Sequence, residues 1–422
     1  MRDHGSNVTR YRRKLSRGFT LVELLVAMMA GLMVAAAAFS FSKQSTRVFA
    51  QEARVSSAQM SVLTGFQRLQ ADVARASYMS TPDMLRDLNF NRVCAPGYND
   101  WPEAMQELTG LRVTSTDGAP DVVRITGNLS SAEMFPVRAI AEDAAGSGHI
   151  VYLQANTGPI TRAGFLEDGK DYDAAFKEVF KAGRLLRILD QEGRMEFEVI
   201  KDSSYVLGGQ PLVVTFGPLP LKGELSTELG STSAPCGIAG FGVGVQANPV
   251  SVVEYRIASL ASVPPYRDTI YHNDYYVEES DDNRMELVRS EVLFAEQAGG
   301  GLSEQPAPEL VAEFAVDLQI GVRTSAGGPG LTYFPPGSVE DLTEPAATDQ
   351  PGNAATGPTA IRTVELRLVV RSREPDRAGD TDPDDPLRAG GFMFRAPVNG
   401  QFARARTLLA DVALMNQRGD AW

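Results

Sequence analysis

Apolar residues form one uninterrupted block near the N-terminus and many short alternating runs after it. The block covers residues 19–41 and holds a single charge, Glu23, while residues 24–42 carry no charge. At about 1.5 Å per residue, this uncharged run is long enough to cross a hydrocarbon core about 30 Å thick. The pattern therefore predicts a membrane-spanning helix over residues 19–42.

Beyond Lys43 the apolar positions keep a helical spacing. They recur three, four or seven residues apart, at Val48, Val55, Val62, Phe66, Leu69, Val73 and Ala76. This is the stripe of an amphipathic helix, and Pro82 should end it. We therefore expect one long helix over residues 19–80, with Gly31 and Gly65 as candidate bend points. A free coiled coil is less favoured for the second half, because the stripe is short and lacks regular charged flanks.

Strand-like alternation dominates the chain after residue 82. Strands are expected at residues 121–126, 148–153, 211–216, 251–257 and 362–371. Short helices are expected at residues 99–109, 132–144 and 171–183. Loops are expected at residues 296–308, 324–360 and 374–390. The predicted fold class is α+β, with the long N-terminal helix packed on an antiparallel β-sheet globular domain.

The charge pattern orients the apolar block. The whole chain has a formal net charge of -13, but residues 1–18 hold six Lys and Arg residues against one Asp. Basic residues stay on the cytoplasmic side, so we expect a cytoplasmic N-terminus and export of everything after Lys43. No nucleic-acid partner is expected, because the acidic chain lacks the basic face that such binding requires.

Two structural interpretations of the apolar block are open. A secretory signal peptide would have a small-residue cleavage site after the apolar core, and residues 35–38 could serve. A plain membrane anchor fits the length but leaves Glu23 unexplained. An unpaired carboxylate in a membrane helix costs on the order of 2–3 kcal/mol, and such residues usually have a partner.

A third interpretation rests on the residues Arg17-Gly18-Phe19-Thr20-Leu21-Val22-Glu23. With the basic leader and the apolar stretch, they resemble the processing site of type IV prepilins and pseudopilins. The resemblance implies that prepilin peptidase removes residues 1–18 by cutting between Gly18 and Phe19, and then methylates the new amine of Phe19. Glu23 stands at the fifth mature position, where this family has a glutamate.

The resemblance also implies a role for Glu23 in assembly. When the apolar helices stack in a filament, the Glu23 carboxylate of one subunit can neutralise the Phe19 amine of its neighbour. Removing one partner of such a buried pair costs about 3–5 kcal/mol, even where the pair itself gains little. We therefore expect Glu23 to set the register of assembly.

Four phrases in the second half of the chain strengthen the resemblance. They lie, in this order, at residues 252–257, 284–289, 309–320 and 361–372. Their succession resembles the PilW class of minor pilins and, more distantly, the J-type pseudopilins of type II secretion. We expect residues 252–257 and 284–289 to pair as a hairpin that turns near residues 281–283. The resemblance covers residues 17–80 well and about 250–372 loosely.

This family implies a location and partners. The protein would be a single-pass inner-membrane protein with a periplasmic head, and would then join a pilus and act at its tip. Its partners would be prepilin peptidase, membrane lipid before assembly, other minor pilins, the major pilin and a tip adhesin. The expected function is priming of type IV pilus assembly. The alternative is a J-type pseudopilin of a type II secretion system.

The head divides into two predicted parts. Residues 83–250 resemble no family that we can name and form a candidate insertion, whereas residues 251–422 are the β-rich part that carries the family-like phrases. Residues 1–18 are the leader, and residues 19–80 are the helix.

Other candidate sites are few. Cys94 and Cys236 are both in the exported region, where a disulfide would persist; two free buried thiols are the alternative. The alternating carboxylates Asp380, Asp382 and Asp384 could bind calcium, but the segment lacks the Gly and Glu of an EF-hand loop, which favours a solvated acidic loop.

No enzymatic activity and no cofactor are expected. The chain has no Gly-x-Ser-x-Gly elbow and no His-Glu-x-x-His motif, and its three histidines lie far apart, at residues 4, 149 and 272.

Overall fold

The fold contains one long helix, two β-sheets and a small β-barrel. The computed structural model describes residues 20–87, 89–90, 103–106, 108–143, 148–163, 165, 171–191, 193–206, 208–217, 221–222, 238–239, 244–264, 266–269, 284–294, 305–325, 330–345, 357–371, 393–395 and 402–416. The chain divides into two compact units, Met1–Gln59 and Met60–Trp422. The predicted fold class, α+β with a long N-terminal helix and a mostly antiparallel sheet domain, is confirmed.

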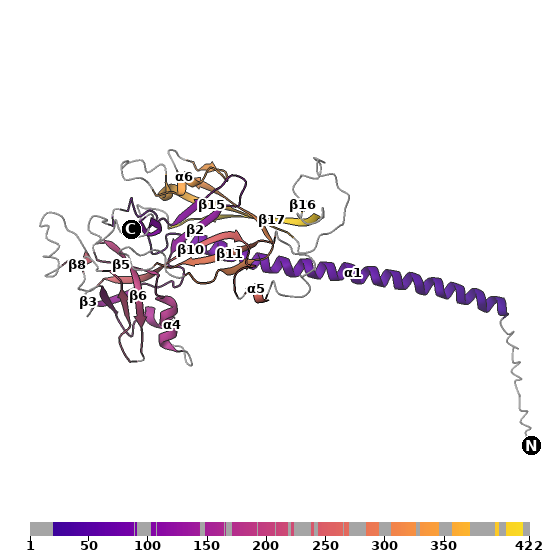
Figure 1. The fold of residues 1–422 in the computed structure, drawn as a ribbon, viewed down its shortest axis with the longest axis horizontal. Helices are drawn as coiled ribbons and strands as arrows, with labels where there is room; N and C mark the ends of the chain where they lie inside the picture. Colours follow the sequence, from indigo (N-terminus) through magenta and orange to yellow (C-terminus); the bar gives the residue numbers. More distant parts are fainter. Residues whose placement is uncertain are drawn as a thin grey trace, which may run out of the picture. The chain divides into compact units, whose positions relative to one another are not determined.

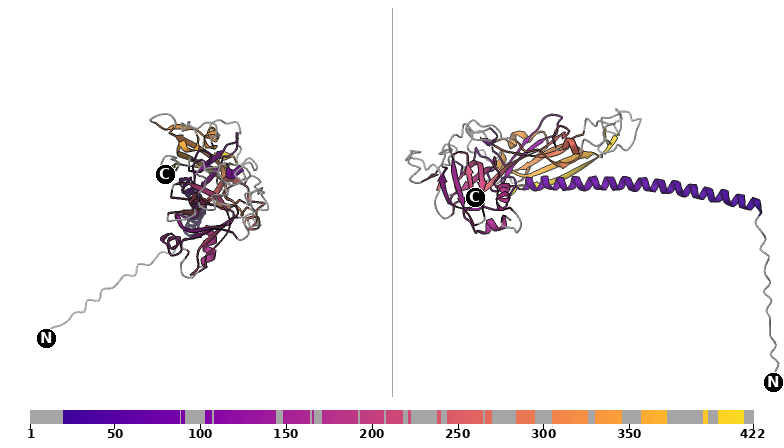
Figure 2. Two further views of the ribbon diagram at one scale, coloured as in Figure 1. Left: turned by 90° about the vertical axis from the view of Figure 1, so that its left-hand side faces the viewer. Right: turned by 60° about the horizontal axis from the view of Figure 1, so that its bottom comes forward.

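Helix α1 runs without a break from Leu21 to Ala74 (Figures 1 and 2). The expected end near residue 80 is wrong, because residues 75–79 form turns in which Ser77 and Met79 have positive φ angles of 62° and 50°. The Ser77 N–H donates instead to the carbonyl of Thr126 at 2.8 Å. A tertiary hydrogen bond thus replaces the helical one and ends α1 before Pro82 could act.

The amphipathic stripe of α1 is buried where the second unit begins. Five of the predicted apolar positions are buried, with exposures between 0% and 7%: Val62, Phe66, Leu69, Val73 and Ala76. They pack in one hydrophobic core together with residues of the two β-sheets. This part of α1 is therefore an element of the globular unit, as the stripe predicts.

The first sheet has the strand order β1-β2-β10-β11-β12, and all its pairings are antiparallel. Its strands are β1 (Leu111–Thr114), β2 (Val122–Gly127), β10 (Gln246–Ala258), β11 (Glu286–Val292) and β12 (Glu309–Ala312). The expected pairing of residues 252–257 with 284–289 is confirmed, with Arg256 opposite Val288. The turn expected near residues 281–283 lies outside the described residues.

The second sheet has the order β14-β13-β15-β17-β16. Its strands are β13 (Ala315–Thr324), β14 (Thr332–Phe334), β15 (Ile361–Arg371), β16 (Met393–Arg395) and β17 (Phe402–Ala413). The run 309–320 is two strands, β12 and β13, because the chain turns at Phe314, whose φ angle is 55°. The inner residues of β13 and β15 pack in the same core as α1.

Six strands close into a barrel, with β10 shared between the barrel and the first sheet. The barrel strands are β3 (Phe135–Glu142), β4 (His149–Leu153), β5 (Leu185–Leu189), β6 (Met195–Ser204), β7 (Leu212–Thr215) and the first part of β10. Each strand pairs antiparallel with the next in the ring β10-β3-β4-β7-β6-β5-β10. Closure leaves no free edge among these strands.

The remaining elements are short. The helices are α2 (Glu103–Gln106), α3 (Gly158–Arg162), α4 (Tyr172–Val179), α5 (Tyr266–Thr269) and α6 (Glu340–Thr343), with a 3-10 turn at Pro358–Ala360. A parallel pair joins β8 (Leu221–Lys222) to β9 (Ile238–Ala239). The α4 helix lies within the predicted range 171–183, and α2 lies within 99–109, so both helix predictions are confirmed in part.

Two element predictions are wrong. Within the range 132–144 that was predicted as a helix, Phe135–Glu142 form strand β3, because Phe135 and Val137 alternate inward and the strand pairs with β4 and β10. Residues 324–360 are not one loop, since β14, α6 and the 3-10 turn lie within them. The other predicted strands are present as β2, β4, β7, β10 and β15.

Gly65, a candidate bend point, allows a close contact. A Cβ atom at Gly65 would lie 2.0 Å from the carbonyl oxygen of Val311 in β12, a distance that real side chains do not tolerate. At Gly31 nothing lies within 4 Å of such an atom. The glycine at 65 therefore lets edge strand β12 approach the helix backbone directly.

We predict that Gly65→Ala destabilises the globular unit by roughly 1–3 kcal/mol, because the methyl group forces α1 away from β12. Urea unfolding of the full chain in detergent micelles measures the change. Gly31→Ala is the matched control and should leave the stability unchanged or slightly higher, since alanine is the better helix former. Equal stability of the two variants would contradict the contact.

Candidate functional site

The N-terminus of α1 carries a reciprocal cap made by Thr20 and Glu23. The Thr20 N–H and the Thr20 hydroxyl each donate to a Glu23 carboxylate oxygen at 3.1 Å. The Glu23 N–H donates to the Thr20 hydroxyl oxygen at 3.3 Å. This is the capping-box arrangement, in which the N-cap residue and the third helical residue satisfy each other's free groups.

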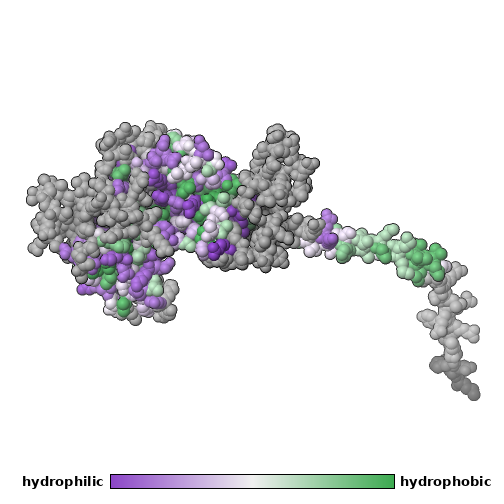
Figure 3. All heavy atoms as spheres, viewed as in Figure 1, coloured by the Kyte–Doolittle hydropathy of each residue, from purple (hydrophilic) through white to green (hydrophobic). Residues whose placement is uncertain are grey.

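The helix that follows is apolar and exposed. Residues Leu21–Thr46 are long and apolar enough to cross a membrane, and their most hydrophobic stretch has no buried residue. Large apolar side chains are exposed along it, among them Leu21 at 78% and Phe41 at 77%. The surface of this segment is hydrophobic along most of its length and becomes hydrophilic at its C-terminal end (Figure 3). Such a surface requires lipid or other apolar helices around it.

Glu23 is the one charge in this segment before Lys43. Within the described part of the chain its hydrogen bonds go to Thr20 and it pairs with no cation. The cap lowers the cost of placing a carboxylate in this segment. Lipid offers no hydrogen-bond donors to the Glu23 oxygens, whereas Thr20 donates to them. It supplies no opposite charge, so the carboxylate keeps its capacity to pair with an amine.

Most of the other predicted site residues lie outside the described part of the chain. This holds for Gly18, Phe19, Cys94 and Cys236, and for the acidic trio Asp380, Asp382 and Asp384. The cleavage, disulfide and calcium predictions therefore stay predictions. Among the described residues, no group of three or more His, Cys, Asp or Glu side chains is arranged to hold a metal.

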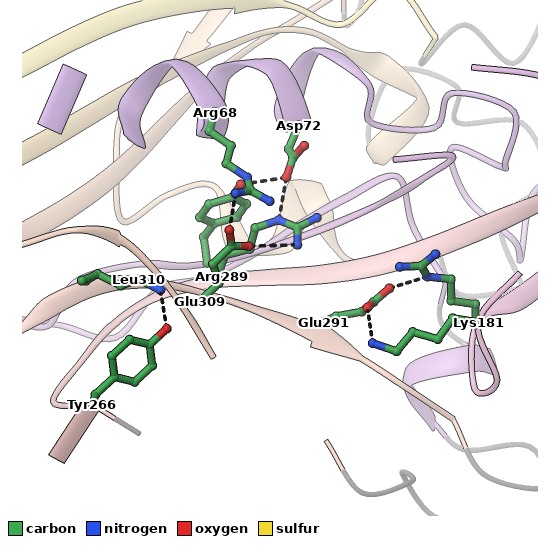
Figure 4. A network of polar contacts seen from close by, with 10 residues as sticks. Arg68, Asp72, Lys181, Tyr266, Arg289, Glu291, Glu309 and Leu310 are labelled. Carbon is green, nitrogen blue, oxygen red and sulfur yellow. Dashed lines mark hydrogen bonds and ion pairs between the residues drawn. The ribbon is translucent and has the colours of Figure 1, made fainter. Parts of the chain in front are cut away.

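A polar network joins the last turns of α1 to the first sheet (Figure 4). The Asp72 carboxylate accepts a hydrogen bond from the Tyr255 hydroxyl at 2.7 Å and one from the Arg289 guanidinium at 2.9 Å. Arg289 also lies 3.8 Å from Glu309, which pairs with Arg68. The network thus links the helix to β10, β11 and β12 at once.

Burial sets the electrostatics of this network. The side chains of Asp72 and Arg289 are only 13% and 16% exposed, whereas those of Arg68 and Glu309 are nearly half exposed. Burial, and then the Asp72 charge, raise the pKa of Tyr255, which keeps it a hydrogen-bond donor. Burial alone would lower the pKa of Arg289, but Asp72, together with Tyr255 and Glu309, outweighs burial and raises it. The inner pair is therefore a fixed ion pair.

The turn that ends α1 is held by glycine and asparagine. A Cβ atom at Gly127 would lie 2.5 Å from the Arg75 carbonyl oxygen, so only glycine fits at the end of β2. The Asn128 N–H donates to the Tyr78 carbonyl, and the Asn248 side chain donates to the Met79 carbonyl, both at 2.8 Å. These contacts satisfy the Tyr78 and Met79 carbonyl groups in the turn that follows α1.

Two features were not predicted from the sequence, namely the cap between Thr20 and Glu23 and the ion pair between Asp72 and Arg289. The capping partner Thr20 had a signal, because Thr-x-x-Glu before an apolar run is a capping-box pattern. Asp72 and Arg289 had none, since they lie 217 residues apart and only the fold brings them together.

Comparisons with known proteins identify the N-terminal segment. A family model described as the prokaryotic N-terminal methylation motif matches residues 13–39. No curated protein and no solved structure matches the chain. The motif, with the membrane-type helix, indicates a type IV pilin-like or pseudopilin protein that is anchored in a membrane, processed by prepilin peptidase and assembled with pilin or pseudopilin partners. The finer resemblance to PilW-class minor pilins stays a prediction.

We predict that Asp72→Asn lowers the free energy of unfolding by on the order of 3 kcal/mol, because it leaves the buried Arg289 charge without its partner. Urea unfolding of the full chain in detergent micelles measures the change. Arg68→Gln, one turn earlier on the same helix, removes an exposed charge and should cost less than about 1 kcal/mol. A similar loss in both variants would show that the inner pair has no special role.

Proposed function

We propose that this chain is a minor pilin that prepilin peptidase cleaves after Gly18 and methylates on Phe19, and that takes part in priming type IV pilus assembly. The processing step is supported by the methylation motif, which matches residues 13–39 and so covers the junction. In this proposal the chain has a structural role in assembly and no enzymatic activity.

The arrangement around Glu23 carries the proposal. The carboxylate lies four residues after Phe19, on an exposed apolar helix, and its bonds to Thr20 leave its charge without a counterpart in the described residues. Cleavage after Gly18 creates one positive amine at Phe19. When apolar helices pack side by side, the amine of one subunit and the carboxylate of the next can meet in a low-dielectric surrounding, where opposite charges attract strongly.

The size of the head supports a position at the pilus tip. The second compact unit runs from Met60 to Trp422 and contains two sheets and a barrel. A subunit inside a packed shaft has neighbours on every side, so a bulky head restricts that position, whereas the tip has free space above it. We therefore place the chain at the tip, with other minor pilins, the major pilin below and an adhesin as partner.

The proposal implies an orientation of the chain in the inner membrane and a movement of α1 from lipid into the filament. Residues 1–18 stay in the cytoplasm because of their positive charge, and the head lies in the periplasm. Before assembly α1 is embedded in inner-membrane lipid, and after processing it moves from lipid into a filament.

The first prediction concerns the mature N-terminus. Protein purified from native envelopes should begin at N-methylated Phe19, because processing retains the apolar helix. Amino-terminal sequencing and intact mass measure this. An N-terminus at Met1, or at any residue after the apolar helix, would overturn the proposal.

A second prediction concerns Glu23. Glu23→Leu should be processed normally but should fall at least tenfold in its ability to restore surface pili to a deletion strain, because the Phe19 amine loses its partner on assembly. Thr20→Ser, which keeps the hydroxyl cap, is the control and should assemble normally. The same strains report on the pseudopilin alternative, since a defect in protein secretion with intact pili would assign the chain to a secretion system.

A further inference from the structure

The barrel is inserted between two neighbouring strands of the first sheet. Strands β2 and β10 pair antiparallel, and Gly127 at the end of β2 lies opposite Ser251 in β10. The chain therefore leaves the sheet at Gly127 and returns to its direct cross-strand neighbour after residues 128–250. A short hairpin turn would connect the same two positions.

Residues 128–250 close on themselves. The ring of six strands is completed at Gln246 and Ala247, which pair with β3 on one edge of β10 and with β5 on the other. From Ser251 onward, β10 pairs with β2 and then also with β11. The change of partners along this strand marks where the barrel ends and the first sheet begins.

The barrel has its own hydrophobic core. Every buried residue of that core lies between Phe135 and Ala247. At its centre four phenylalanine rings contact one another in a closed circle, with centroid distances of 4.7–6.0 Å: Phe135, Phe165, Phe176 and Phe180. The buried stripe of α1 belongs to the other core, which contains no residue of the barrel core. The buried residues around the stripe of α1 thus all lie outside residues 128–250, although Leu129 packs against them and the Asn248 side chain donates to the Met79 carbonyl.

The barrel is attached to the rest of the unit through one wall and a few polar contacts. Its outer residues Leu185, Met195 and Phe197 pack in a third apolar cluster with residues from outside the barrel. At the same junction, the Arg184 and Lys181 side chains pair with Glu291 of β11, at 2.5 Å and 3.3 Å (Figure 4). These contacts orient the barrel without linking the two cores.

We propose that residues 128–250 are a separately folding barrel carried by a pilin scaffold, and that the scaffold alone makes the subunit contacts of assembly. The scaffold consists of α1, the first sheet and the second sheet. The part of the inference about assembly rests on the proposed function. The part about folding does not, because it depends only on the ring of strands and the separate cores.

The most direct test is a variant of the full chain in which one glycine replaces residues 129–250. This joins Gly127 and Ser251 through Asn128 and the new glycine, and Asn-Gly is the preferred two-residue hairpin turn. Asn128 is kept because its N–H holds the Tyr78 carbonyl after α1. The variant should accumulate, begin at Phe19 and restore surface pili to a deletion strain within twofold of the wild type.

Two matched substitutions test the same division in the complete chain. Phe176→Ala removes a fully buried ring from the barrel core, and Phe66→Ala removes a buried ring from the core around the stripe of α1. In detergent micelles, hydrogen exchange measured by mass spectrometry should speed up at least tenfold in β3–β7 for Phe176→Ala. It should stay unchanged in α1 after Met60 and in β13 and β15. Phe66→Ala should show the opposite distribution and should not restore pili.

Several outcomes would overturn the inference. One is faster exchange in α1, β13 and β15 of Phe176→Ala; another is failure of the barrel-less chain to accumulate. A barrel-less chain that is stable and processed but restores under one-tenth of the pili would show that assembly needs the barrel. A wild-type chain that does not begin at Phe19 would instead overturn the proposed function, and the exchange result would still decide the folding part.

Discussion

The close seating of α1 on the first sheet is the constraint on which the globular unit depends. Gly65 has no side chain where the Val311 carbonyl approaches, so the helix backbone rests directly on edge strand β12. Two turns later, Asp72 receives bonds from Tyr255 and Arg289 in the neighbouring strands. The glycine sets how near the helix lies, and the ion pair sets its position along the sheet, because a shift by one residue would bury an unpaired charge.

The exposed part of α1 depends on surroundings that the globular unit does not provide. Apolar side chains that no other element covers are stable only in lipid or among other apolar helices. In that environment the cap between Thr20 and Glu23 satisfies hydrogen-bonding groups without consuming the charge of the carboxylate. The same residue can therefore stabilise the start of its own helix and still attract an amine from another subunit.

The globular unit has two separate hydrophobic cores, one around α1 and one inside the barrel. Strand β10 belongs to both, since its first residues close the barrel and its later residues lie between β2 and β11. Antiparallel neighbours such as Gly127 and Ser251 tolerate such an addition, because the strands on either side keep their hydrogen bonds whatever the connecting chain does. The fold thus separates the core around α1 from the barrel core, whereas β1 and β2, which lie in the region 83–250 that resembled no known family, pack in the core around α1.

The sequence by itself determined the features that repeat locally. The apolar block, the buried stripe from Val62 to Ala76, the residues around Glu23 and most strands follow from spacing and charge, which act over a few residues. Tertiary structure decided the rest. It made a strand of Phe135–Glu142, ended α1 at Ala74 and gave Gly65 a packing role. It also joined Asp72 to Arg289 and closed the barrel, because these outcomes depend on partners in other elements that local pattern cannot specify.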